Sequence, residues 1–330
     1  MEKKKPTTMI VGTGSAAPDK VVTNFDLEKI VDTSDQWIRE RTGIERRHIL
    51  EEGKTNSDLA AMAAMRAIED AGLTPRDIDC IIQATITPDS LFPATACRVQ
   101  ALINADRAAA FDISAACSGF IYGLVLADSL ITTGKYKRVL VIGSEILSRF
   151  MDWEDRATCV LFGDGAGAVV LASSDGERGI LSDYLRSDGR LADLLGIAGG
   201  GSAMPTSHTT VDEKRHFIHM KGREVFKHAV RTMVDAAKHG LKAAGYKDED
   251  LDLLITHQAN IRIIEAIGER LKLPKENIFV NLQEYGNTSA ASIPLAMDQA
   301  RKEGKLKPGD LCLLVAFGGG FTWASCLVRF

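Results

Sequence analysis

The chain has 330 residues, of which 45% are hydrophobic and 25% are charged, and its formal net charge is −4. These values are typical of a soluble globular protein with one large or two ordinary domains, and the acidic balance argues against a general nucleic-acid binder. No apolar stretch reaches the roughly 18 residues that suggest a membrane span.

Along the chain, apolar runs rich in β-branched residues alternate with helical patterns. This alternation predicts an α/β architecture with mostly parallel sheets that are covered by helices on both faces. The expected strands are 8–11, 80–84, 108–113, 139–142, 168–172, 253–256, 278–281, 311–316 and 325–329. The expected helices include 56–71, 118–132, 223–244, 262–271 and 289–301.

An internal repeat divides the chain. EDAGLTPRDIDCII at 69–82 aligns with KAAGYKDEDLDLLI at 242–255, an offset of 173 residues. ITTGKYKRVLVIG, which contains Gly134, aligns with GKLKPGDLCLLV, which begins at Gly304, an offset of 170. The repeat predicts two halves built from one helix-strand-helix-strand unit. These halves are 1–174 and 175–330, and the glycine-rich stretch 186–210 is predicted to be a long loop between them.

The six cysteines are scattered without CxxC pairs, and the first residues, MEKKKPTTMIVG, lack the apolar region of a signal peptide. Both observations predict a cytoplasmic protein with free thiols.

Cys117 lies in ISAACSGF, where a predicted strand ends and an apolar helix begins. The offset of 170 aligns it with Asn287 in EYGNTSAA, so a local twofold axis would bring both helix starts to one place. A helix N-terminus would lower the thiol pKa from about 8.5 toward neutrality and make Cys117 a nucleophile. The ordinary alternative is a small buried hydrophobe, which is the role expected of the other five cysteines.

Other candidate site residues lie at similar junctions. His257 follows the strand 253–256, where α/β sheets place their ligands, although a lone histidine is more often structural. Asn287 begins a helix, and an N-cap is its ordinary role. The run 318–320, three glycines directly after a strand, would let the backbone approach a ligand and aim N–H groups at an oxyanion.

Several long blocks, in this order, resemble β-ketoacyl-acyl carrier protein synthase III of the thiolase superfamily. They are DISAACSGFIYGL, WEDRATCVLFGDGAGAVVL, HQANIRII, YGNTSAASIPLA and AFGGGFTWASCLVRF. The resemblance extends from IVDTSDQWIRERTGI to Phe330. It implies a five-layered αβαβα thiolase-like fold, a homodimer, and an acyltransferase that initiates type II fatty acid synthesis.

The resemblance also implies an order of chemistry. Cys117 would attack the thioester of a short acyl-CoA, expected to be acetyl-CoA, while the backbone amides of Cys117 and Gly319 hold the oxyanion. His257 and Asn287 would then donate hydrogen bonds to the thioester carbonyl of malonyl-acyl carrier protein as CO₂ leaves. The resulting carbanion would attack acyl-Cys117. Coenzyme A enters as a substrate thioester, and neither a cofactor nor a metal is expected.

Substrate contacts follow from the same resemblance. A planar guanidinium and an indole suit a flat base. Residues 214–242 contain eight Lys or Arg against two acidic residues, which would attract an acidic carrier protein, although a solvated helix face is the ordinary alternative. The implied residues are Trp37 and Arg156 around adenine, Arg41, Gly222 and Asn260 along the coenzyme A channel, Phe92 in the partner subunit's acyl pocket, and Lys227 and Arg262 for carrier-protein docking.

Other functions stay open from the residues alone. A papain-like hydrolase also uses Cys, His and Asn, and 140 residues separate Cys117 from His257. The missing CGSCW-type signature and the repeat argue against it. A thiolase-fold synthase with another starter or product, such as a polyketide starter synthase, is a second alternative. A non-catalytic acyl-CoA or carrier-protein binding module is a third.

Overall fold

The computed structural model describes residues 7–174 and 176–330. Its longer strands form two main sheets. The first has five strands in the order β1-β7-β6-β4-β5, and the second has four in the order β11-β12-β13-β8. Their bounds are β1 Thr8–Ala16, β4 Cys80–Ala84, β5 Ala109–Ile113, β6 Arg138–Ile146, β7 Asp164–Ser173, β8 Gly179–Ser187, β11 Leu253–Thr256, β12 Leu311–Gly318 and β13 Thr322–Arg329.

Both sheets are mixed, which corrects the expectation of mostly parallel sheets. β4 pairs in parallel with β5 and β6, and β11 pairs in parallel with β12. The pairs β1-β7, β6-β7, β12-β13 and β13-β8 are antiparallel. Three residues, 319–321, join β12 to β13, which is too short for the crossover that a parallel pair requires.

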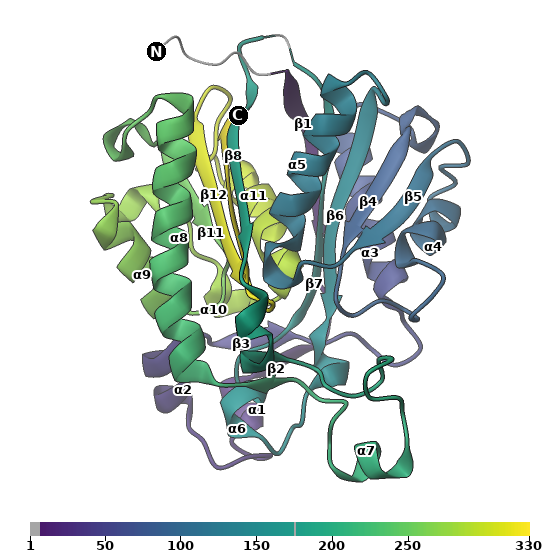
Figure 1. The fold of residues 1–330 in the computed structure, drawn as a ribbon, viewed down its shortest axis with the longest axis vertical. Coiled ribbons are helices and arrows are strands. Elements are labelled where there is room, and N and C mark those ends of the chain that lie inside the picture. Colours follow the sequence, from purple (N-terminus) through teal and green to yellow (C-terminus); the bar gives the residue numbers. More distant parts are fainter. Residues whose placement is uncertain (1–6, 175) are drawn as a thin grey trace.

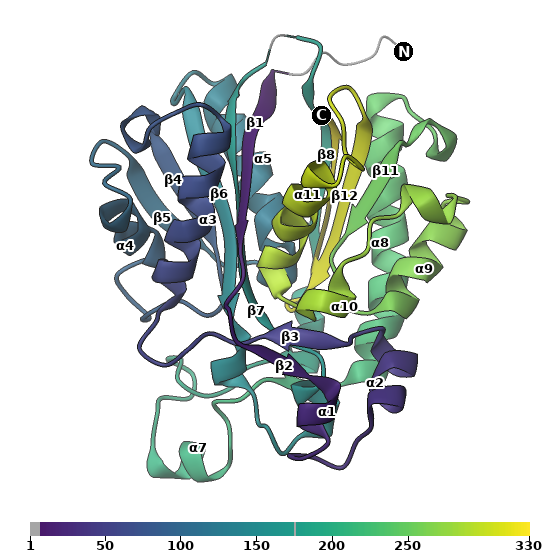
Figure 2. The same ribbon diagram turned by 180° about the vertical axis from the view of Figure 1, so that it is seen from behind.

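The helices form three layers around the sheets, which gives the predicted αβαβα order. α3 and α4 cover the outer face of the first sheet, and α8 and α9 cover that of the second (Figures 1 and 2). α5 and α11 lie between the sheets and contact both. The bounds are α1 Asn24–Leu27, α2 Asp35–Thr42, α3 Asn56–Asp70, α4 Thr95–Leu102, α5 Gly119–Thr132, α6 Arg156–Cys159, α7 His208–Asp212, α8 Gly222–Ala244, α9 Ile261–Arg270, α10 Leu282–Tyr285 and α11 Ser292–Lys302.

The central layer explains why α5 is apolar on nearly every side. Phe120, Ile121 and Leu124 are fully buried in a cluster that also takes in residues of both sheets and of α11. A helix that is apolar all round needs cover all round, and each such side chain contributes about 1.5–3 kcal/mol on burial. A Cβ on Gly123 would lie 2.8 Å from Val141, so glycine allows α5 to pack closely on β6.

The repeated elements recur in the two halves at an offset of 173 residues. Two pairs of 3-10 turns correspond at this offset: η1 (Pro75–Asp77) with η5 (Asp248–Asp250), and η2 (Ala116–Ser118) with η7 (Ser289–Ala291). The first residues of α5 and α11 correspond in the same way. The offset of 170 holds only where these two helices end, because α5 has 14 residues and α11 has 11. The structural counterpart of Cys117 is therefore Ala290, and not Asn287 as the sequence alignment suggested.

Other sequence expectations need correction as well. β8 was not predicted, and the predicted strand at 278–281 forms only the bridge between Leu254 and Ile278 among the described residues. The predicted loop 186–210 begins with the end of β8 and contains η4 (Gly189–Leu194) and β9 (Leu195–Gly196). The boundary predicted at 174 and 175 stays a prediction, because residue 175 lies outside the described residues, as do residues 1–6 of the N-terminal segment.

The remaining elements are short and lie around one end of the sheets. α7 projects away from the body of the molecule (Figures 1 and 2). Among the described residues, no helix combines the length and apolar composition needed to cross a membrane. The short elements are β2 (Val21–Thr23) paired with β3 (Arg46–His48), β9 paired with β10 (His219–Met220), and the 3-10 turns η3 (Leu147–Phe150) and η6 (Lys275–Asn277).

Candidate active site

Cys117 lies in the turn η2, between the end of β5 and the start of α5. The preceding residue, Ala116, has a φ of 47°, in the left-handed region that non-glycine residues seldom adopt. A Cβ on Gly318 would lie 2.5 Å from the backbone nitrogen of Cys117, so only glycine lets β12 approach this turn so closely. The local backbone is thus bent and packed to hold one thiol, which is 8% exposed.

His257 and Asn287 are positioned by the second half of the chain. The backbone N–H of His257 donates to the carbonyl of Val315 (2.8 Å), and its Nδ1 lies 2.8 Å from Oγ of Ser292. The side-chain Oδ1 of Asn287 accepts from the backbone N–H of Ser289 (2.9 Å). The N-cap of η7 is Thr288 and that of α11 is Ala291, so the N-cap expected at Asn287 is wrong, and its side chain instead holds the residue that begins η7.

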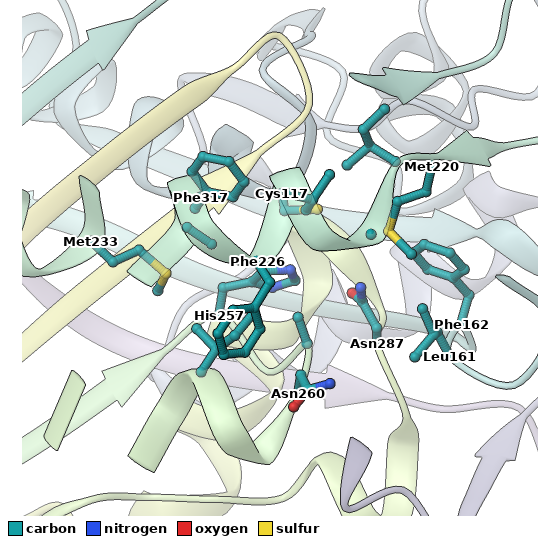
Figure 3. Close-up of a pocket in the computed structure, with 16 residues that line it drawn as sticks. Cys117, Leu161, Phe162, Met220, Phe226, Met233, His257, Asn260, Asn287 and Phe317 are labelled. Carbon is teal, nitrogen blue, oxygen red and sulfur yellow. The ribbon is translucent and has the colours of Figure 1, made fainter. Parts of the chain in front are cut away.

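Cys117, His257 and Asn287 all line one cavity, and their side chains lie close to one another (Figure 3). Cys117 and His257 each follow a strand, whereas Asn287 lies between α10 and η7, and the turns η2 and η7 contact each other. The structure thus brings these three side chains together, and their chemical roles stay predictions. Most of the lining is apolar, and it includes Leu161, Phe162, Leu195, Met220, Val225, Phe226, Ala229, Met233, Ile263 and Phe317.

The predicted low pKa of Cys117 is wrong for this structure. Burial raises the pKa of the thiol to about 12, although a hydrogen bond with the Ser289 hydroxyl acts in the opposite direction. The sequence argument considered the helix N-terminus but not the enclosure of the thiol by the second half. A thiolate is therefore scarce at neutral pH unless another group accepts the proton.

Burial also keeps His257 neutral, because it lowers the pKa of the imidazole to about 3. A neutral imidazole with one N–H is a hydrogen-bond donor at one nitrogen and an acceptor at the other. It is a poor base for a thiol, because its affinity for a second proton is so low. Within the ranges 7–174 and 176–330, no three His, Cys, Asp or Glu side chains are grouped as a metal site would require.

A second cavity of about 480 Å³ is also lined by Cys117. Gly319 lines it together with Cys117, and an oxyanion contact from its backbone N–H stays a prediction. Leu195 of β9 lines both cavities, which makes the stretch 186–210 part of the site wall. The apolar lining of the second cavity includes Ile86, Leu147, Phe162, Ile197 and Ile218.

The first cavity continues to the surface. Gly222 and Phe226 of α8 line both this cavity and an outer one that includes Arg41 and Arg262. Asn260 connects the elements around this mouth, because it accepts from the N–H of Arg262 (2.9 Å) and donates to the carbonyl of Arg41 (3.0 Å). Arg41, Gly222 and Asn260, which were predicted for the coenzyme A channel, thus line two adjoining cavities, the inner of which reaches Cys117.

Trp37 and Arg156 lie in contact, with the guanidinium carbon 4.9 Å from the centre of the indole ring. Arg41 also lies over this ring, at 5.8 Å. A flat base between two planes needs about 3.5 Å on each side. Arg156, which donates to the carbonyl of Asp32 (2.8 Å), must therefore move away from Trp37 before a base can enter.

Phe92 and Lys227 lie outside the cavities at Cys117. Phe92 is 85% exposed and follows Leu91, which is 89% exposed. Lys227 is exposed on α8, beside Phe226 in sequence, and the guanidinium of Arg262 lies 5.6 Å from the ring of Phe226. Arg262 therefore lines the outer cavity, while Lys227 lines none of these cavities and its docking role stays a prediction.

Three polar residues of the site were missed at the sequence level. Glu145, at the end of β6, is fully buried and accepts a hydrogen bond from Ser289, and Ser292 contacts His257. A single acid inside the apolar run VLVIGSEIL was the available signal for Glu145. The serines looked like ordinary residues of a helix start.

Comparison with known proteins assigns the family. Residues 111–189 match the family model of 3-oxoacyl-[acyl-carrier-protein] synthase III, and residues 241–330 match that of its C-terminal part. A relative from Caldanaerobacter subterraneus, named β-ketoacyl-[acyl-carrier-protein] synthase III, is 55% identical over 97% of each chain.

Solved structures agree with this assignment. The 3-oxoacyl-[acyl-carrier-protein] synthase III of Aquifex aeolicus has a TM-score of 0.91 and 53% identity, covering 98% of this chain and 100% of that one. The priming β-ketosynthase of the R1128 polyketide pathway has a TM-score of 0.90 but only 32% identity, covering 99% and 98%. The identities therefore favour the first kind of enzyme. The chain belongs to the β-ketoacyl-[acyl-carrier-protein] synthase III family of condensing acyltransferases, which have the thiolase-like fold.

Proposed function

We propose that this chain condenses a short acyl-CoA, with acetyl-CoA as the first candidate, with malonyl-acyl carrier protein, releasing CO₂ and starting fatty acid synthesis. The observation that carries the proposal is the convergence of Cys117, His257 and Asn287 on one cavity that leads to the surface (Figure 3). Membership of the family supports both substrate classes. Coenzyme A takes part as the substrate's thioester, and the reaction needs no further cofactor.

In the first half-reaction, Cys117 Sγ attacks the thioester carbonyl and coenzyme A leaves. The backbone amides of Cys117 and Gly319 stabilise the oxyanion. The close approach of β12 to η2 at Gly318 supports this arrangement, because it holds both backbone segments against the same cavity wall.

In the second half-reaction, His257 and Asn287 donate hydrogen bonds to the thioester oxygen of the malonyl group. Loss of CO₂ leaves negative charge on this oxygen, and fixed donors in an apolar cavity stabilise that charge strongly. The low pKa of His257 supports the role, because a neutral imidazole can donate without taking up a proton. The carbanion then attacks the acyl carbon and releases Cys117.

A homodimer is part of the proposal, with Phe92 reaching the acyl pocket of the partner subunit. The exposure of Leu91 and Phe92 supports it, because two adjacent large apolar side chains are rarely left in water. Light scattering on the purified protein should give twice the mass of one chain. We place the protein in the cytoplasm, since no disulfide joins the cysteines within the described residues and reducing compartments keep thiols in this state.

A papain-like hydrolase is disfavoured by the histidine itself. In that mechanism the imidazole must take the thiol proton, but burial lowers the pKa of His257 to about 3. A polyketide-type starter synthase is disfavoured by its lower identity to this chain.

The decisive experiment supplies acetyl-CoA and malonyl-acyl carrier protein to the purified protein. We expect equal amounts of CO₂ and acetoacetyl-acyl carrier protein, and one acetyl group on Cys117 when acetyl-CoA is given alone. Cys117→Ala should lose the acetyl group, whereas Cys97→Ala, at the exposed cysteine, should keep it. Hydrolysis of acetyl-CoA without CO₂ release, or an acetyl group on another cysteine, would contradict the proposal.

A further inference from the structure

Glu145 is a buried carboxylate next to the reaction centre for which the proposed steps have no use. It accepts hydrogen bonds from the hydroxyls of Thr85 (3.2 Å) and Thr87 (2.5 Å), and from the backbone N–H of Ile86 at 3.1 and 3.2 Å. The hydroxyl of Ser289 is a further donor to its Oε1 (3.1 Å). Burial raises the pKa of Glu145 to about 7, which is near the pH at which a general base works best.

Ser289 connects this carboxylate to the nucleophile. Its hydroxyl donates to Glu145 (3.1 Å), lines the second cavity together with Cys117, and lowers the pKa of the Cys117 thiol. Its φ of 47° is in the left-handed region, and this unusual backbone aims the side chain between the two groups. The backbone N–H of Ser289 donates to Asn287, which holds the turn in place (2.9 Å).

The Ser289 hydroxyl has only one proton to donate. When Glu145 is ionised, that proton goes to the carboxylate and the thiol donates to the Ser289 oxygen. When Glu145 is protonated, the hydroxyl is free to donate to a Cys117 thiolate instead. The three groups therefore form a chain along which one proton can move from sulfur to carboxylate and back.

We propose that Glu145 is the base for the Cys117 thiol, acting through the Ser289 hydroxyl, and that it returns this proton when condensation releases the thiolate. The inference rests on the proposed acyl-Cys117 intermediate. It also resolves a difficulty of that step, because the enclosed thiol ionises too little by itself.

The bonds and protons balance in both half-reactions. On acylation, the S–H bond of Cys117 breaks as the sulfur bonds to the acyl carbon, Ser289 takes this proton, and its own proton passes to Glu145. Coenzyme A leaves as a thiolate and takes one proton from water. On condensation, the new C–C bond replaces the S–C bond, and the proton returns from Glu145 through Ser289 to Cys117. The cycle consumes one proton overall, as the loss of CO₂ from a malonyl carboxylate requires.

The surroundings of Glu145 limit the groups that could imitate this role. The neighbours that face it are the hydroxyls of Thr85, Thr87 and Ser289, the N–H of Ile86, and the Cys117 thiol, which is the titratable one among them. The competing explanation is a structural anchor that ties the segment 85–87 to β6. Asp164 offers a matched control, since burial also raises its pKa and Leu50 and Ser148 hydrogen-bond it, with no contact to the thiol.

The test measures single-turnover acylation by acetyl-CoA alone, followed by intact mass between pH 6 and 9. In the native protein the rate should rise with a midpoint near pH 7 and then level off. Glu145→Gln and Ser289→Ala should each slow acylation about 100-fold at pH 7. Their rates should lose this midpoint and rise about tenfold per pH unit, because only the free thiolate reacts. The double variant should be no slower than either, and Asp164→Asn should behave like the native protein.

The outcomes separate the two proposals. If the native protein gains no acetyl group on Cys117, the proposed function fails. If the native protein is acylated and either variant keeps the midpoint near pH 7, Glu145 is only an anchor and this inference is overturned. Ser289→Ala changes a different element from Glu145→Gln, so a folding defect in one variant leaves the other to decide.

Discussion

The Nδ1 atom of His257 lies 2.8 Å from the Oγ atom of Ser292, on the first turn of α11. The same Oγ accepts the backbone N–H of Gln258 at 3.3 Å. Since this oxygen already accepts one hydrogen bond, its own proton is available to Nδ1. When Ser292 donates this proton to Nδ1, the neutral imidazole has its own proton on Nε2, which supplies the donor that decarboxylation needs.

Removal of this contact should affect only the second half-reaction. In Ser292→Ala the imidazole can adopt either tautomer, so we expect CO₂ release from malonyl-acyl carrier protein to fall about tenfold. Acylation of Cys117 by acetyl-CoA should stay at the native rate. Equal loss in both measurements would indicate a general disturbance of η7 and α11.

The two donors should be separable from the nucleophile. His257→Ala and Asn287→Ala should each lower CO₂ release about 100-fold or more, because one donor to the developing oxyanion is lost. Intact mass should still find one acetyl group on Cys117 in both variants. Failure of both to be acylated would mean that these residues activate the thiol.

The buried His257 and Glu145 should give opposite slopes to the pH dependence of stability. The folded pKa of His257, about 3, is below its usual 6.5, so the unfolded chain binds the extra proton and stability falls as pH drops through this window. The folded pKa of Glu145, about 7, is above its usual 4.5, so its contribution falls as pH rises between these values. Each slope is at most about 1.4 kcal/mol per pH unit.

The two slopes oppose each other between pH 4.5 and 6.5, and variants can expose them. Relative to the native protein, Glu145→Gln should gain unfolding free energy more steeply with rising pH, and His257→Gln should do the reverse. Denaturant titrations at several pH values measure this difference. Parallel curves for all three proteins would contradict the assigned pKa shifts.

The mouth of the channel should discriminate between the two substrates. Lys227→Glu should raise KM for malonyl-acyl carrier protein several-fold, since an acidic partner is then repelled, and added salt should reduce the difference from the native protein. Lys238→Glu is the matched control, exposed on the same helix and about 16 Å farther along it. Equal effects of the two changes would indicate that the basic residues of α8 form an ordinary solvated helix face and not a docking site.

The pair Trp37 and Arg156 should affect coenzyme A alone. Arg156→Lys replaces a planar group with a point charge, so we expect a higher KM for acetyl-CoA and an unchanged KM for malonyl-acyl carrier protein. Stopped-flow fluorescence should also detect the opening of this pair, because Arg156 lies on the indole in the free protein. An unchanged KM for acetyl-CoA would show that Trp37 and Arg156 do not contribute to coenzyme A binding.

The sequence predicted buried strands better than partly exposed ones. β4 and β11 have the predicted bounds, since every residue in them is buried. β8 was missed because its second part is half exposed and polar. β1 was predicted too short because Gly12 and Gly14 resemble turn residues, whereas a Cβ at either position would collide with the backbone of α3 near Ala67.

The site could be predicted in part, because residues at strand ends gather at one edge of a sheet. This rule selected His257 and supported Cys117, whereas Asn287 was selected through the offset of 170, which the structure does not bear out at this position. It could not reveal the raised pKa of the thiol, which depends on how tightly the second half covers the first. Nor could it find Glu145, because its link to Ser289 spans 144 residues of sequence.

Cys117 and Ala290 occupy corresponding positions at the starts of α5 and α11, so duplication has left the two copies unequal at their common centre. One copy holds the thiol, and the other holds the imidazole and the amide. A protein that consisted of either half alone would lack part of the candidate site. Within one gene, selection can adjust acyl transfer mainly through the first copy and decarboxylation mainly through the second.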